Sequence, residues 1–391
     1  MLTTQPYANN TPITYKQYPK KLSQQIGKAK KGNMQNDNSQ YNNSKNGDPL
    51  QRTLHYLQNV DKKKLAISNI LTIALIAFVI YASFTARNFF SINTVFAVVN
   101  NMASVLPMAI GMGLIMIVGG TDLSAGRASG FVGVIAASLL FQLTTDNQIF
   151  PNIAEIPIIV PIIISIIVGA LISSINALMI LKLKVHPFIL TLAMSMVLQG
   201  IMFWYLGLGT NANKSISIVV NTPYYDLINS GFVVNTQKLY YFVFVIIVLV
   251  VAMWIVMNKT PIGRSMYAVG CNREAATVTG ISIFKTTLIV FAIAGALFGL
   301  TGFIKGAQSS NGLNSGNGLD LNAIAACIIG GVSFAGGIGK IRGILFGVFL
   351  MELVSYALIA MRIDSTYISL ITGAIIIIAV SIDMIKVRQS K

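Results

Sequence analysis

The sequence predicts an all-α membrane protein that crosses the bilayer about ten times. Of its 391 residues, 54% are hydrophobic and only 10% are charged, and the mean hydropathy is +0.70. An ordinary soluble domain carries about 25% charged residues. The apolar runs are long and continuous, whereas a membrane β-barrel would show short segments of alternating hydrophobicity. A polytopic helical protein is therefore the expected fold class.

Ten apolar segments follow the first 64 residues, and each is close to the roughly 20 residues that a spanning helix needs. The second segment contains Pro107, which makes it a candidate for a kink or a split. The eighth is short and glycine-rich, which makes it a candidate for a partial span. The segments are expected near residues 65–83, 94–118, 126–143, 156–181, 187–207, 239–257, 286–304, 321–338, 342–361 and 365–383.

The distribution of basic residues predicts that both termini are cytoplasmic. With this topology, twelve Lys and Arg residues after the tail fall on the inside and five on the outside, as the positive-inside rule requires. The inside set is Arg127, Lys182, Lys184, Lys259, Arg264, Arg273, Lys285, Lys340, Arg342, Lys386, Arg388 and Lys391. The outside set is Arg87, Lys214, Lys238, Lys305 and Arg362.

Residues 1–64 are predicted to form a disordered basic cytoplasmic tail, and residues 65–391 the transmembrane domain. The tail holds eleven basic and three acidic residues and lacks an apolar period, so it cannot bury enough surface to fold alone. Its bases could contact anionic membrane lipid, or they could be a solvated positive-inside flank. The second interpretation is favoured.

The stretch Gly119–Arg127 places a carboxylate and a guanidinium, flanked by glycines, between two long apolar runs. Backbone that leaves a helix at membrane depth must be buried in protein or line a wet cavity. Ionisable groups at that depth usually mark a pathway. One interpretation is therefore the broken-helix core of a transport path. The other is a tight cytoplasmic turn in which Asp122 and Arg127 are solvated, and the residues alone leave both open.

A related glycine pattern recurs near the C-terminus. Gly119-Gly120 followed by Ser124-Ala125-Gly126 resembles Gly330-Gly331 followed by Ala335-Gly336-Gly337. Each precedes a GxxxG spacing, Gly126/Gly130 and Gly343/Gly347, that permits close helix approach. Paired glycine-interrupted segments point to the central site of a transporter, although a short match in a glycine-rich chain can also arise by chance.

The inside loop 258–285 is predicted to contain a short helix. Asn272 suits an N-cap, Glu274 suits the first turn and Gly280 suits a C-cap. Such a helix would offer a surface to a soluble partner, and the alternative is a simple connector.

The residues that enzymes and nucleotide-binding proteins need are not visible in the sequence. The nearest candidate for a phosphate loop, Gly337–Ile341, lacks the earlier glycine and the Ser or Thr after Lys340. Two cysteines and two distant histidines give neither a disulfide framework nor a metal cluster. The bases lie in a tail and in short loops, which argues against nucleic acid. We expect no catalytic residues, metal or cofactor.

Three motifs, in order, resemble the permease subunits of ribose- and galactose-type ABC importers. They are Thr121–Arg127, the cytoplasmic stretch Gly270–Gly280, and Asn322–Gly337. The Ala125-Gly126-Arg127 variant is most similar to the galactose/methyl-galactoside branch. The resemblance covers the chain from about residue 65 to the end, and the long polar tail departs from it.

The resemblance implies a homodimer in the cell inner membrane, with glycine-rich broken segments near the dimer centre. A separate cytoplasmic ATP-binding subunit would drive alternating access, and a periplasmic binding protein would deliver a monosaccharide. It implies that Asp122, Ser124, Arg127, Asn322 and Ser333 lie near the translocation pathway. It also implies that Asn272, Arg273, Glu274, Ala275 and Ala276 form the helix that couples to the ATPase.

Two other classes of function remain open. A proton-coupled secondary transporter would work alone through Asp122 or Glu352, because a carboxylate in a membrane segment is often functional. Glu352 could instead stay protonated and form a hydrogen bond with a neighbouring helix, and this interpretation is favoured. A membrane-embedded enzyme or structural subunit is the third class.

Overall fold

The computed structural model describes residues 62–86, 89, 91–140, 149–150, 156–208, 215–216, 223–234, 237–309 and 311–389. The chain divides into two units, residues 1–66 and 67–391, and the second holds nearly all of the described residues. Residues 1–61 of the predicted tail lie outside the described residues.

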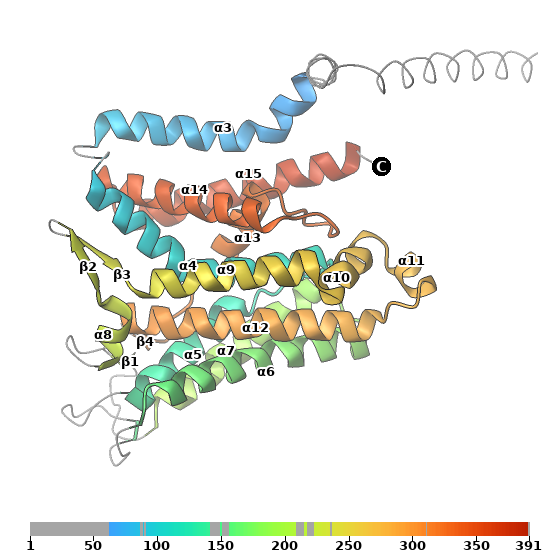
Figure 1. The fold of residues 1–391 in the computed structure, drawn as a ribbon, viewed down its shortest axis with the longest axis horizontal. Coiled ribbons are helices and arrows are strands. Elements are labelled where there is room, and N and C mark those ends of the chain that lie inside the picture. The colour runs from blue at the N-terminus through green and yellow to red at the C-terminus, as the bar shows by residue number, and fades with distance from the viewer. Residues whose placement is uncertain are drawn as a thin grey trace, which may run out of the picture. The chain divides into compact units, whose positions relative to one another are not determined.

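A helix lies at each of the ten apolar segments expected from the sequence (Figure 1). These helices are α3 (Lys62–Thr85), α4 (Ile92–Ile117), α5 (Ala125–Leu140), α6 (Ile159–Leu183), α7 (Pro187–Leu206), α9 (Phe242–Lys259), α12 (Ile283–Gln308), α13 (Leu319–Ile329), α14 (Ile341–Ala360) and α15 (Ser365–Gln389). Among the described residues, six are long and apolar enough to span a membrane, namely α4, α6, α7, α9, α12 and α14. A polytopic helical protein is confirmed, whereas the count of ten spans and the side of the termini stay predictions.

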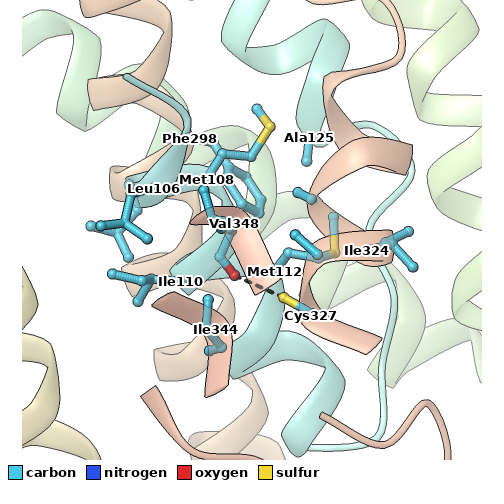
Figure 2. Packing of buried hydrophobic residues seen from close by; sticks show 14 of the residues in the cluster. Leu106, Met108, Ile110, Met112, Ala125, Phe298, Ile324, Cys327, Ile344 and Val348 are labelled. Carbon is cyan, nitrogen blue, oxygen red and sulfur yellow. Dashed lines mark hydrogen bonds between the residues drawn. The ribbon is translucent and has the colours of Figure 1, made fainter. Parts of the chain in front are cut away.

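Helix α4 lies at the centre of the described bundle. In its most apolar 18-residue window 67% of the residues are buried, as in α12, against 22% in α7 and α9. It packs against α12, α13 and α14, and Figure 2 shows Met108 and Met112 of α4 beside Phe298, Ile324 and Val348 of these three helices. The helix continues through Pro107, so the split considered from the sequence does not occur.

Helices α6 and α12 approach each other closely, because glycines face each other where they cross. A Cβ atom on Gly295 would lie 2.3 Å from the carbonyl oxygen of Gly169, and one on Gly299 would lie 2.0 Å from that of Ser165. Both distances are shorter than any real Cβ contact. Small residues at these positions therefore set the distance between α6 and α12.

Four short strands are the main difference from the predicted all-α fold. Strand β1 (Ser215–Ile216) pairs antiparallel with β4 (Asn311–Gly312), and β2 (Gly231–Val234) pairs antiparallel with β3 (Gln237–Tyr240). With α8 (Pro223–Asn229) they lie at one end of the bundle, which we call the hairpin end (Figure 1). Strands of two to four residues are too short to produce a readable period in a sequence.

The opposite end carries two helices in the loop between α9 and α12. Helix α10 (Pro261–Cys271) begins at Thr260, whose side chain accepts a hydrogen bond from the Gly263 N–H. Helix α11 (Arg273–Val278) follows at once. This end, which we call the coupling end, also carries the C-terminus of α4 and the linker of residues 330–340 between α13 and α14 (Figure 1).

The glycine packing between α6 and α12 yields a test of the fold. We expect Gly299→Ala to lower the free energy of unfolding by about 1–3 kcal/mol, because the added methyl overlaps backbone of α6. The measurement is thermal unfolding in detergent. Gly200→Ala on α7 is the matched control, because nothing lies within 4 Å of a Cβ there, and it should leave stability unchanged or raise it by up to about 1 kcal/mol. Equal effects of the two variants would contradict the packing described.

Candidate functional site

The non-helical residues between α4 and α5 are buried inside the protein. Thr121, Asp122, Leu123 and Ser124 are each 7% exposed or less, and Asp122 is fully buried. A solvated turn, the second interpretation of this stretch, is therefore wrong for Asp122. The segment has the character expected of a broken helix, in which irregular backbone is surrounded by protein.

Hydrogen bonds from three residues surround the Asp122 carboxylate. Ser124 donates twice to Oδ1, from its backbone N–H at 2.9 Å and from its Oγ at 2.6 Å. On α6, Asn176 Nδ2 lies 3.3 Å from both carboxylate oxygens, and Ser173 Oγ lies 3.3 Å from Oδ2. A buried carboxylate is tolerated only when it is satisfied in this way. Asp122 thus joins the break to α6.

Two further contacts hold the same segment. The Leu123 N–H donates to Thr191 Oγ1 of α7 at 3.0 Å, and Asn176 Nδ2 donates to Ser124 Oγ at 2.8 Å. Asn176 therefore links α6 to the break between α4 and α5. The side chains of Asp122 and Ser124 bind residues of α6, and these bonds hold the break in position. Their place near a translocation pathway stays a prediction.

Arg127 joins the first turn of α5 to the loop that precedes α13. Its Nη1 donates to the carbonyl of Leu313 at 2.8 Å, and its Nη2 donates to Asn317 Oδ1 at 3.4 Å. The side chains of Asp122 and Arg127 therefore bind different neighbours. Asp122 holds the break itself, and Arg127 holds the start of α5.

The N-termini of α5 and α13 meet inside the bundle. A Cβ atom on Gly126 would lie 2.5 Å from the carbonyl oxygen of Gly316 and 2.8 Å from Asp320 Oδ1, in the first turn of α13. A Cβ atom on Gly130 would lie 2.1 Å from the carbonyl of Ser315. Each helix N-terminus carries a partial positive charge, so the meeting point favours groups that accept hydrogen bonds. Paired half-helices of this kind form the central sites of many transporters.

The other two predicted pathway residues lie at opposite ends of α13. Asn322 is half-buried in the first turns of α13, close to the meeting point, and its N–H bonds the carbonyl of Gly318 at 3.0 Å. Ser333 lies in the linker after α13, where its Oγ accepts a hydrogen bond from the Ala335 N–H at 3.2 Å. Roughly 10 Å of helix separates them, at 1.5 Å per residue. The structure thus brings Arg127 and Asn322 to one region and places Ser333 at the coupling end.

The helices α4 and α13 end in the same way at the two glycine patterns. At the end of α4, Gly119 has φ +83° and the Gly120 N–H bonds the carbonyl of Ile115 at 2.9 Å. At the end of α13, Gly331 has φ +80° and the Val332 N–H bonds the carbonyl of Cys327 at 2.9 Å. Both are Schellman caps, which require a left-handed residue. The two stretches therefore share one helix cap, shifted by one position from the sequence match, while the residues that follow differ, because α5 begins at Ala125 and Gly336-Gly337 lie in the linker.

The short helix predicted in the loop 258–285 is present as α11. Asn272 Oδ1 accepts a hydrogen bond from the Ala275 N–H at 3.0 Å, and Glu274 lies in the first turn. Gly280 has φ +81° and follows the helix. Arg273, Glu274 and Ala275 are exposed, whereas Ala276 is buried against the bundle. The N-cap, first turn and C-cap are confirmed, and the docking of a partner on this surface stays a prediction.

Several residues of the site were missed from the sequence. The Thr260-Pro261 pair is an N-cap followed by proline at the first helical position, and this signal could have revealed α10. Burial raises the pKa of the Tyr267 hydroxyl of α10 above its ordinary value, so that Tyr267 stays a hydrogen-bond donor. No local pattern marks Asp320, or Asp383 of α15, whose Oδ2 accepts a hydrogen bond from the Phe334 N–H at 2.9 Å.

Two bases of the topology count, Arg127 and Lys305, interact with neighbouring segments of the bundle. Arg127 is in the first turn of α5, and Lys305 is in the last turn of α12, where it interacts electrostatically with Glu352 of α14. Without them the count is eleven inside against four outside, so the favoured topology is unchanged. Glu352 thus has a basic partner on another helix.

A bundle of apolar helices with two interrupted segments that meet in its interior is the architecture of a multi-pass membrane permease. The chain belongs to the family described as branched-chain amino acid transport system / permease component, whose model matches residues 94–380. The resemblance to ribose- and galactose-type permease subunits and the placement in the inner membrane as a multi-pass protein are confirmed.

The relatives include two kinds of import permease. The galactose/methyl galactoside import permease protein MglC of Escherichia coli K12 is 33% identical over 287 residues, which are 73% of this chain and 84% of the relative. The MglC protein of Treponema pallidum is 33% identical over 350 residues, which are 85% of this chain and 65% of the relative. The ribose import permease protein RbsC of Escherichia coli K12 is 29% identical over 323 residues, which are 80% of this chain and 92% of the relative. No solved structure is a significant match.

The buried carboxylate yields a test of the site. We expect Asp122→Ala to lower the free energy of unfolding by about 2–4 kcal/mol, because Ser124, Ser173 and Asn176 lose their acceptor inside the protein. Thermal unfolding in detergent measures the loss. Asp226→Ala is the control, because that carboxylate is exposed on α8, and it should cost less than about 1 kcal/mol. A small effect of Asp122→Ala would show that the network does not hold the break.

Proposed function

We propose that this permease translocates a monosaccharide into the cytoplasm by alternating access, driven by ATP hydrolysis in a separate subunit. The observation that carries the proposal is the meeting of the α5 and α13 N-termini in a chain that belongs to a permease family. The relatives named as galactose/methyl galactoside permeases are 33% identical, against 29% for the ribose permease, so galactose or a methyl-galactoside is the proposed substrate.

A neutral sugar fits the polar groups near the meeting point. Sugar hydroxyls donate and accept hydrogen bonds and need no counter-charge. The loop before α13 and its first turns offer amides and exposed or half-buried backbone, with Asn317 and Asn322 among them. Arg127 is already bound to Leu313 and Asn317, which supports a role in shaping this loop rather than in neutralising an anion.

The proposed assembly contains two copies of the chain, a cytoplasmic ATP-binding subunit and a periplasmic sugar-binding protein. Helix α11 supports the ATP-binding partner, because it is capped at both ends and its Arg273 and Glu274 side chains are exposed. A carrier that works alone has no need of such a surface. A proton-coupled mechanism through Asp122 is not favoured, since that carboxylate is fully buried among hydrogen-bond donors.

Reconstitution tests the proposed function. We expect galactose uptake into proteoliposomes only when the permease, the ATP-binding subunit, the binding protein and ATP are all present. Uptake is measured with radiolabelled sugar, and ribose serves as the competing substrate. Uptake by the permease alone, driven by a pH gradient, would contradict the proposal and support the secondary transporter. Uptake of ribose in preference to galactose would change the substrate and leave the mechanism intact.

The cap of α11 tests the coupling role. We expect Asn272→Ala to reduce the amount of ATP-binding subunit that copurifies with the permease, because losing an N-cap costs about 0.5–2 kcal/mol in a helix of only six residues. Asn272→Ser is the matched control, because serine caps helices as well as asparagine does, and it should retain the partner. If both variants copurify the ATP-binding subunit like the unaltered chain, α11 is not the docking helix.

A further inference from the structure

Helix α10 contacts two separate parts of the chain at Gly270. A Cβ atom at this position would lie 1.8 Å from the carbonyl oxygen of Ile117, in the last turn of α4, and 2.7 Å from the Gly337 N–H nitrogen in the linker after α13. The backbones of α10, α4 and the linker therefore meet with no side chain between them. A residue larger than glycine would force one of the three apart.

Hydrogen bonds join the same three segments. Tyr267 Oη of α10 donates to the carbonyl of Gly339 at 2.7 Å, and the Gly337 N–H donates to the carbonyl of Ile117 at 2.8 Å. Arg273 Nη2 of α11 lies 3.4 Å from the carbonyl oxygen of Gly119. We call these contacts the three-way junction, formed by Ile117, Gly119, Tyr267, Gly270, Arg273, Gly337 and Gly339.

The linker in the junction is held by contacts with α4, α10 and α15. Gly336 has φ +92° and Gly337 has φ +74°, a backbone conformation that side chains with a Cβ rarely adopt. A Cβ atom on Gly336 would lie 3.0 Å from both Gly119 Cα and the Gly270 carbonyl oxygen. The bond from the Phe334 N–H to Asp383 holds the linker on α15 as well. A displacement of α10 would therefore act on the linker through these close contacts, and on α4 through Ile117.

From the junction, the chain runs into both broken segments, one through α4 and α5 and the other through α13. Following α4 beyond Gly119, the chain enters the break at Asp122 and then α5. Going back from the linker, the chain enters α13, whose N-terminus meets that of α5 at Gly126 and Gly316. One contact region at the coupling end thus holds the C-terminus of α4, from which the chain continues through the break into α5, and the linker at the C-terminus of α13.

We propose that the three-way junction transmits movement of α10 and α11 to both broken segments at once, with Tyr267 and Gly270 as its positioning residues. This inference rests on the proposed function, since it assumes an ATP-binding subunit that moves α11. A link of this kind makes the two half-helices respond together. In its absence, the ATP-binding subunit could hydrolyse ATP without moving the sugar.

The test uses Tyr267→Phe in the complete reconstituted importer. This change removes the bond to Gly339 and keeps the ring. We expect ATP hydrolysis and copurification of the ATP-binding subunit to be retained, while the sugar imported per ATP hydrolysed falls about two- to tenfold, the range expected for one hydrogen bond. Tyr205→Phe is the matched control, because it removes a hydroxyl contact of equal length to Ser138 between α7 and α5, away from the junction.

The outcomes separate this inference from the proposed function. If the unaltered chain shows no ATP-dependent uptake, the proposed function fails and the inference fails with it. If the unaltered chain transports and Tyr267→Phe keeps the same ratio of sugar to ATP, only the inference is overturned. A loss of assembled complex, with an unchanged ratio in the complex that remains, would show that Tyr267 has a merely structural role and would also overturn it.

Discussion

The structure depends on how backbone groups are satisfied where helices stop inside the bundle. In hydrocarbon, an unpaired N–H or carbonyl costs several kcal/mol, so a helix can end there only if the protein replaces its missing partners. At the end of α4, the Schellman cap at Gly119 closes the last turn, and Asp122 and Thr191 then bind the freed amides of Ser124 and Leu123. Every later feature of the site follows from this break.

The loop before α13, where the other half-helix begins, is held by different means. In the loop before α13, the Leu313 carbonyl accepts a hydrogen bond from Arg127. The same loop packs against the backbone of Gly126 and Gly130, where no side chain intervenes. A side-chain network holds the break before α5, and a glycine surface with one guanidinium holds the loop before α13. Because both half-helices present their N-termini to the same region, their partial positive charges favour groups that accept hydrogen bonds, and the Asp320 carboxylate lies there.

Glycine has two distinct uses in this chain. In α12 and α6, Gly295, Gly299 and Gly169 allow two long helices to touch along their backbones, which makes that pair a rigid frame. At the coupling end, Gly336 and Gly337 allow the linker to turn against α10. The first use sets the distance between α6 and α12, and the second allows the linker to change direction.

Local sequence patterns predicted the apolar helices and α11 but not the partners of their residues. Hydrophobic length predicted a helix at all ten apolar segments, and capping residues predicted α11 from Asn272 to Gly280, because both signals depend on neighbours in the chain. The short strands were missed because two to four residues carry no period.

The sequence alone determined that this chain is a polytopic helical protein with two related glycine-rich interruptions, since composition and local spacing encode both. Whether Asp122 is solvated or buried was decided only by the tertiary structure, because Ser173 and Asn176, which bind it, lie about fifty residues further along the chain. The same holds for the junction, where Tyr267 and Gly339 are 72 residues apart. Contacts between distant residues arise from packing, and no local pattern specifies them.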